Sequence, residues 1–138
     1  MPVGALNSHI SKKGYVSPDF EKIWLEPSQV QNIVTVEVTL ANVQAKLGMI
    51  PADAAQHIAQ YSTISDELVE KVAAGKVGNP LVAALDALRS EIPEDYRGWV
   101  HFGATSQDIL DTARALQSRA LSTGSSSSYL TLIPASLS

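Results

Sequence analysis

Hydrophobic and polar positions along the chain repeat mostly with the period of an α-helix. The longest regular run spans residues 28–47, and its apolar positions recur at alternating steps of three and four. These positions form a coiled-coil-like seam made of Ile33, Val36, Leu40, Val43 and Leu47. A second apolar stripe beside it consists of Val30, Val34, Val38, Ala41 and Ala45.

The middle of this run also alternates apolar and polar residues as a half-buried strand would, from Val34 to Leu40. Length separates the two interpretations, because the helical period continues for about five turns. The run then meets Gly48, and glycine is the usual residue at a helix C-terminus. We therefore predict a helix, preceded by a break at Pro27 and Ser28.

Shorter helical patterns follow, each opened by residues that favour a helix start. We expect helices over residues 54–61, from 65 to the glycine at 75, over residues 81–89 and from 107 to about 121, with a loop over 92–98. An earlier helix should begin at Ser17-Pro18-Asp19. No segment reads as a strand, so the predicted fold class is all-α.

The chain divides into three parts by composition. Residues 1–16 look irregular, residues 17–121 form the helical domain, and residues 122–138 are rich in serine and carry no charge. The last part is either a flexible natural tail or out-of-frame or spliced sequence. The abrupt end of the amphipathic pattern near Arg119 favours the second interpretation.

Composition narrows the class of protein. The chain is 45% hydrophobic and 17% charged, with a net charge of −4 and no cysteine. This balance argues against a nucleic-acid or membrane-surface partner, and the lack of cysteine excludes disulfides and thiolate metal sites. The first residues do not resemble a signal peptide, and no apolar run approaches the roughly 20 residues of a membrane helix. We expect a soluble cytoplasmic protein.

The candidate chemistry lies where the last helix begins. His101 precedes Gly103 on a loop, and Thr105-Ser106-Gln107-Asp108 has the form of a capping box in which Asp108 bonds back to the Thr105 amide. First-turn amides, two hydroxyls and an imidazole near a positive helix end suit a carboxylate or phosphate ligand. The plainer alternative is an ordinary helix cap beside a packed histidine.

The same stretch resembles a known family. Trp99-Val-His-Phe-Gly-Ala-Thr-Ser-Gln-Asp-Ile-Leu-Asp-Thr112 is similar to a signature block of the fumarase/aspartase superfamily, and its Gly-Ala-Thr-Ser-Gln-Asp variant looks like the carboxymuconate cycloisomerase branch. Upstream, Gln44-Ala-Lys-Leu-Gly-Met-Ile-Pro51 and Gly78-Asn-Pro-Leu81 resemble further blocks. The resemblance covers residues 15–118 approximately.

That resemblance implies an all-α fold in which an N-terminal helical domain leads into a central helix bundle. It also implies a homotetramer that acts on a small dicarboxylate or tricarboxylate, without cofactor or metal. Thr105 and Ser106 would bind the substrate carboxylate, Gln107 and Asp108 would shape the pocket, and His101 would contact the substrate. Asn79, where adenylosuccinate lyases have a histidine, is assigned to the same site and favours the cycloisomerase reaction over adenylosuccinate lyase.

The family's general base is a serine on a mobile loop with a Met-Pro-x-Lys element, and this chain contains no such element. General base catalysis typically contributes 100- to 10,000-fold in rate, to order of magnitude. We therefore expect a truncated lyase or cycloisomerase subunit that is inactive by itself. The alternatives are an adenylosuccinate lyase fragment, or a non-catalytic helical module that docks on full-length subunits through the Ile33 to Leu47 seam.

Overall fold

The structure, a computed structural model, describes residues 26–74 and 79–123 and is helical over those residues, with no strand among them. The helices are α3 (Glu26–Lys46), α4 (Ala52–Ala59), α5 (Asp66–Ala74), α6 (Pro80–Glu91), α7 (Glu94–Arg97) and α8 (Ser106–Thr123). The all-α prediction is confirmed. The expected irregular segment 1–16, the helix expected from Ser17 and the tail beyond residue 123 lie outside the described residues.

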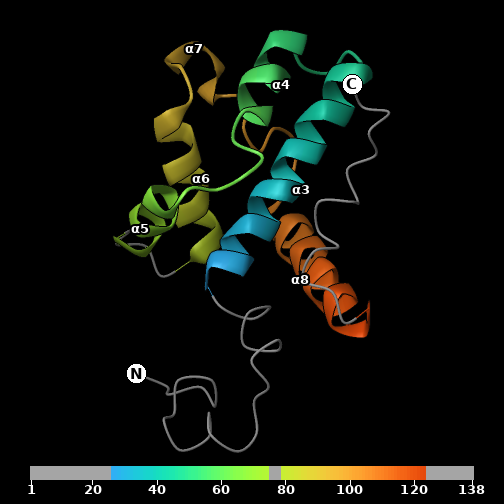
Figure 1. Ribbon diagram of the computed structural model, residues 1–138. Coiled ribbons are helices and arrows are strands. Elements are labelled where there is room, and N and C mark those ends of the chain that lie inside the picture. The colour runs from blue at the N-terminus through green and yellow to red at the C-terminus, as the bar shows by residue number, and fades with distance from the viewer. Residues whose placement is uncertain (1–25, 75–78, 124–138) are drawn as a thin grey trace, which may run out of the picture.

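Helix α3 occupies the centre of the fold. It packs against α4, α6 and α8, and α5 packs mainly against α6. Figure 1 shows α8 alongside α3 on one side, while α5 and α6 lie on the other. The helix prediction for residues 28–47 is therefore confirmed, and the helix begins slightly earlier, at Glu26. Pro27 lies in the first turn of this helix. Proline lacks a backbone N–H, but the N–H groups of a first turn have no acceptor within the helix, so no helical hydrogen bond is lost.

The buried side of α3 differs from the predicted seam. The second stripe forms the core, since Val30, Val34, Val38 and Ala41 are all at most 3% exposed. Within the seam Ile33 is buried, but Val43 is 43% and Leu47 is 70% exposed. An α-helix has 3.6 residues per turn, so a strict 3.5-residue repeat drifts by about 20° per heptad and its far end rotates away from the core.

The C-terminus of α3 follows the glycine signal. Gly48 adopts a left-handed conformation with φ of 70°. Its amide donates to the Ala45 carbonyl at 3.0 Å, and the Met49 amide donates to the Gln44 carbonyl at 2.8 Å. These are the two hydrogen bonds of a Schellman motif, which redirects the chain toward α4.

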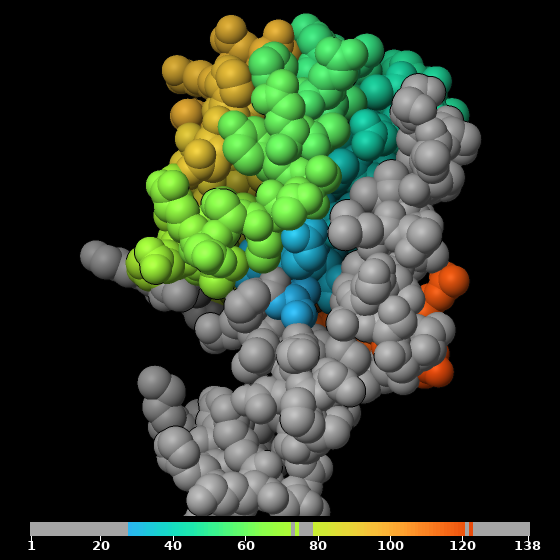
Figure 2. Space-filling model, in the orientation of Figure 1, coloured from blue at the N-terminus to red at the C-terminus, as the bar shows by residue number. Residues whose placement is uncertain are grey.

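The shorter helices occur close to their predicted ranges, with one correction. Residues 92–98 were expected to be a loop, whereas Glu94–Arg97 forms the single turn α7. The turn follows Pro93, whose fixed backbone angle suits the residue before a helix. Figure 2 shows α4 and α7 adjoining on one face of the molecule.

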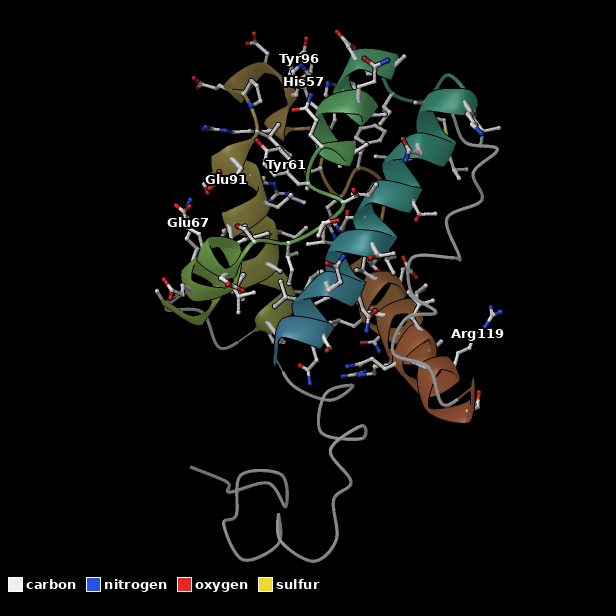
Figure 3. The ribbon with its side chains drawn as sticks, in the orientation of Figure 1. His57, Tyr61, Glu67, Glu91, Tyr96 and Arg119 are labelled. Carbon is white, nitrogen blue, oxygen red and sulfur yellow. The ribbon has the colours of Figure 1, made fainter. Side chains whose placement is uncertain are left out.

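Tyrosines connect these short helices. The Tyr61 hydroxyl donates to the Glu91 carbonyl at the end of α6 at 2.7 Å, and Tyr96 of α7 donates to Asp53 of α4 at 3.0 Å. His57 stacks on Tyr96 with ring centroids 4.3 Å apart (Figure 3). The stacked His57 ring is half-buried.

Candidate functional site

The loop between α7 and α8 carries the candidate site and has an unusual backbone. His101 has φ of 63° and Gly103 has φ of 69°. A left-handed conformation is uncommon for any residue other than glycine, although histidine adopts it more readily than most. Such conformations persist only where surrounding contacts hold them, and they concentrate at functional sites.

Glu37 of α3 holds the His101 ring. The Glu37 Oε1 atom lies 2.7 Å from His101 Nδ1, and the side chains are 1% and 15% exposed respectively. Burial raises the pKa of Glu37 above its ordinary value, while the hydrogen bond and charge of His101 and the charge of Arg89 act against that rise. The second oxygen, Oε2, is buried and has no hydrogen-bond partner among residues 26–74 and 79–123. Within the described part of the chain, the pair is therefore a buried carboxylate–imidazole contact that engages one carboxylate oxygen.

Two further side chains hold the loop backbone on either side of His101. Arg89 of α6 donates to the Val100 carbonyl at 3.2 Å, and Gln44 of α3 donates to the Phe102 carbonyl at 2.7 Å. Helices α3 and α6 thus fix both flanking peptides as well as the ring. This arrangement explains how the loop maintains a left-handed histidine.

The sequence interpretation missed Glu37, Gln44 and Arg89. A signal was present for the first two, since Ile33, Glu37, Leu40 and Gln44 follow one another at helical spacing on one side of α3. A charged residue and an amide on an otherwise apolar stripe indicate that this side meets polar groups. Arg89 carried no comparable signal, because it stands near the end of α6 like many basic residues at helix C-termini.

The N-terminus of α8 contains the back-bond of the predicted capping box. The Asp108 carboxylate accepts from the Thr105 amide at 3.0 Å and from the Thr105 hydroxyl at 2.9 Å. These hydrogen bonds hold the pKa of Asp108 below its ordinary value, and His101 adds to the lowering. The back-bond predicted from the sequence is therefore present.

The other predicted site residues at this helix end are exposed. Ser106 and Gln107 both face solvent, and the Gln107 amide donates to Asp111 at 2.6 Å. The Ser106 hydroxyl and the first-turn amides thus lie at the open, positive end of α8. The structure brings His101, Thr105, Ser106, Gln107 and Asp108 together within one loop and the helix turn that follows it.

Asn79 stands apart from this group. Its side chain accepts from the Leu81 amide at 3.0 Å and caps α6. The His101 loop follows the opposite end of α6, and the 12 residues of that helix extend about 18 Å. Within the described residues, Asn79 is therefore a helix cap that is not joined to the rest of the candidate site.

No group of three or more His, Cys, Asp or Glu side chains in the described residues is arranged to hold a metal ion. Helices with the length and apolar character to cross a membrane are likewise absent from residues 26–74 and 79–123. The groups around His101 are an imidazole, hydroxyls and amides at a positive helix end, together with the carboxylates of Glu37 and Asp108. Hydroxyls and amides at such a helix end can bind anions and stabilise negative charge as it develops.

No family model matches the chain. Adenylosuccinate lyase of Methanocaldococcus jannaschii is 37% identical over 105 residues, which make up 74% of this chain and 22% of that protein. The 3-carboxy-cis,cis-muconate cycloisomerase of Acinetobacter baylyi is 39% identical over 108 residues, or 73% of this chain and 24% of that protein. N-acetyl-S-(2-succino)cysteine lyase of Dickeya dadantii is 33% identical over 105 residues.

The fold has a counterpart among solved structures. The crystal structure of fumarate lyase from Mesorhizobium superposes with a TM-score of 0.63 at 37% identity, covering 71% of this chain and 23% of that one. The chain therefore spans less than a quarter of the length of the relatives that it matches. The similarity is in both sequence and fold, over the greater part of this chain.

Proposed function

The chain belongs to the fumarase/aspartase superfamily over the part that these relatives cover, and from this membership we infer a function for its described residues. We propose that they supply the carboxylate-binding part of a lyase active site. The parent reaction that we propose is the reversible cycloisomerisation of 3-carboxy-cis,cis-muconate. The observation that carries the proposal is a histidine, His101, that Glu37 holds on the loop leading into the N-terminus of α8.

The arrangement suits the chemistry of the family. Removing a proton beside a carboxylate places additional negative charge on that carboxylate, and fixed donors stabilise this charge more strongly than they stabilise the ground state. Thr105 and Ser106 would bind the carboxylate and His101 would contact the substrate, while Gln107 and Asp108 shape the pocket. We assign Asp108 its role through Thr105, because its carboxylate accepts both Thr105 hydrogen bonds.

The remainder of the active site has to come from other residues. The chain contains no Met-Pro-x-Lys element to carry the general base. We therefore propose that the 138-residue chain is inactive alone and that its parent acts as a homotetramer on a dicarboxylate or tricarboxylate, without a cofactor.

Adenylosuccinate lyase is the second candidate reaction. The specific support for it is that relatives bearing this name match the chain about as well as the cycloisomerase does. Two sequence features favour the cycloisomerase: the Gly-Ala-Thr-Ser-Gln-Asp form of the block and asparagine at position 79. Because Asn79 caps α6, the first feature is the stronger of the two.

Chimeric enzymes test the proposal. Residues 26–120 replace the homologous segment in the Acinetobacter cycloisomerase and, separately, in the Methanocaldococcus adenylosuccinate lyase, and each chimera is assayed on its own substrate. We expect activity in the cycloisomerase chimera, and background turnover from the 138-residue chain by itself. Activity only in the adenylosuccinate lyase chimera would transfer the assignment to the second candidate.

A point variant then tests the site. Ser106→Ala in the active chimera should lower kcat/KM by about 100-fold, which is typical when one donor to a developing negative charge is removed. Ser118→Ala is the matched control, because Ser118 lies exposed on the same helix and its hydroxyl donates to the Arg114 carbonyl. Equal activity in the two variants would contradict the assignment of this helix end.

A further inference from the structure

The contact between Glu37 and His101 has a chemical consequence for the ring's second nitrogen. We propose that Glu37 is a positioning residue whose Oε1 accepts the Nδ1 proton of His101, so that Nε2 is the ring nitrogen left to contact the substrate. The nature of the ligand rests on the proposed function. The protonation of the two His101 ring nitrogens can be measured without any ligand.

Geometry gives the first support. The 2.7 Å separation of Glu37 Oε1 and His101 Nδ1 is that of a charge-assisted hydrogen bond. A carboxylate acceptor at one ring nitrogen determines the tautomer and leaves the other nitrogen for a ligand. The ring is also held in place, since Arg89 and Gln44 fix the carbonyls on either side of it.

The state of Glu37 gives the second support. Its Oε2 has no partner within the described residues, and a buried acceptor left unsatisfied opposes folding. An apolar side chain would fill the same position without that penalty. A buried carboxylate that engages one oxygen only, and engages it with His101, is better explained by its effect on the ring than by its effect on the fold.

The surrounding charges are consistent with this role. Arg89 of α6 acts electrostatically on Glu37, and His101 acts on Asp108 at the start of α8. An ionised Glu37 is the buried counter-ion of a His101 imidazolium, the form in which Nε2–H donates to a carboxylate. The alternative is a protonated Glu37 that donates to a bare Nδ1, which leaves the ring neutral with its proton on Nε2. Burial, which raises the pKa of Glu37, favours that alternative, so the two forms have to be distinguished by measurement.

Nitrogen NMR of the histidine rings in the full ligand-free chain makes this distinction. The His101 signals are identified by their loss in His101→Gln, and His57 serves as an internal reference. We expect Nδ1 to be protonated at neutral pH, with Nε2 either bare or also protonated. A neutral ring with bare Nδ1 and protonated Nε2 would overturn the proposal, and this measurement needs no variant of Glu37.

A variant extends the test to binding. In Glu37→Gln the neutral amide pairs with either tautomer, so we expect mixed His101 tautomers. The amide is also no counter-ion for the imidazolium whose Nε2–H donates to a carboxylate, so we expect affinity for fumarate, used as the probe, to fall about tenfold. Glu70→Gln makes the same chemical change at an exposed position of α5 and should alter neither. An unchanged tautomer in Glu37→Gln would contradict the proposal. Absence of fumarate binding in the unmodified chain, with Nδ1 protonated, would count against the proposed function and leave the role of Glu37 standing.

Discussion

Helix α3 is buried on two sides. One side is apolar and closely packed, and the other carries polar side chains of which some atoms make no hydrogen bond within the described residues. The apolar side carries Val30, Val34, Val38 and Ala41, which belong to one apolar core with Leu81 and Leu88 of α6. The polar side carries Glu37 and Gln44, which bond to His101 and to the Phe102 carbonyl. Buried atoms of Asn32, Glu37 and Gln44 have no hydrogen-bond partner among the described residues.

The two sides of α3 contribute differently to stability and to the position of the His101 loop. Apolar side chains need only close contact, so the first side is complete with the helices that the structure describes. Polar side chains need partners with defined geometry, and each missing partner opposes folding. The polar side therefore lowers stability while positioning the loop, an exchange that is common at functional sites.

The largest effect that we expect comes from the apolar side. Leu81 is fully buried, and Leu81→Ala should lower the free energy of unfolding by about 2–5 kcal/mol because it removes apolar contacts and leaves a cavity. Urea denaturation measures the change. Leu47→Ala is the control, since Leu47 is 70% exposed, and it should change stability by less than about 0.5 kcal/mol. Equal losses in the two variants would mean that α3 buries a different side.

An intermediate effect should come from the polar side. His101→Ala removes the partner of a buried carboxylate, and we expect a loss of about 2 kcal/mol. The double variant Glu37→Leu/His101→Ala removes both polar groups and should be more stable than His101→Ala alone. Urea denaturation of the single and double variants gives the coupling between the two residues. A double variant less stable than both single variants would show that the pair stabilises the fold, and that the polar side of α3 does not lower its stability.

The smallest effects concern pH, where the buried and exposed carboxyls should act in opposite directions. Burial raises the pKa of Glu37 above 4.5, so the folded chain retains a proton that the unfolded chain releases. Its contribution to stability is greatest at acid pH and falls as pH rises from 4.5 through the raised value. The Thr105 hydrogen bonds lower the pKa of Asp108 below 3.8, so its contribution is present above 3.8 and is lost as pH falls through the lowered value.

Stability measured against pH separates the two carboxyls. Glu37→Gln should remove the decline above pH 4.5, and Asp108→Asn should remove the loss at the acid end. Gln107→Ala is the control, because Gln107 is an exposed neighbour on α8. It should change neither the decline in stability above pH 4.5 nor the loss of stability at acid pH. If Glu37→Gln steepened the decline above 4.5, the raised pKa of Glu37 would be wrong.

Local features of the fold were predictable from sequence because they depend on neighbours along the chain. Gly48 ends α3 in the left-handed conformation, Asn79 precedes and caps α6, and Asp108 bonds back to Thr105. Each of these involves residues within a few positions of one another, where residue type and spacing decide the hydrogen bond. Periodicity identified two apolar stripes on α3 without saying which of them the fold buries, and Val43 and Leu47 of the seam are exposed.

The contacts that build the candidate site span greater separations. Glu37 and His101 are 64 residues apart in the chain, and Gln44 and Phe102 are 58 apart. The left-handed conformation of His101 likewise depends on side chains from two other helices. No local pattern specifies such pairs, because only the packing of α3, α6 and α8 brings them together.

The sequence by itself determined that the chain is helical, where most of its helices begin and end, and which block resembles the fumarase/aspartase superfamily. Short-range hydrogen bonding and apolar periodicity carry that information. The tertiary structure alone decided which side of α3 is the core and that a buried carboxylate holds His101. Burial is a property of the packed chain, and packing joins a glutamate and a histidine that are distant in sequence into one buried contact.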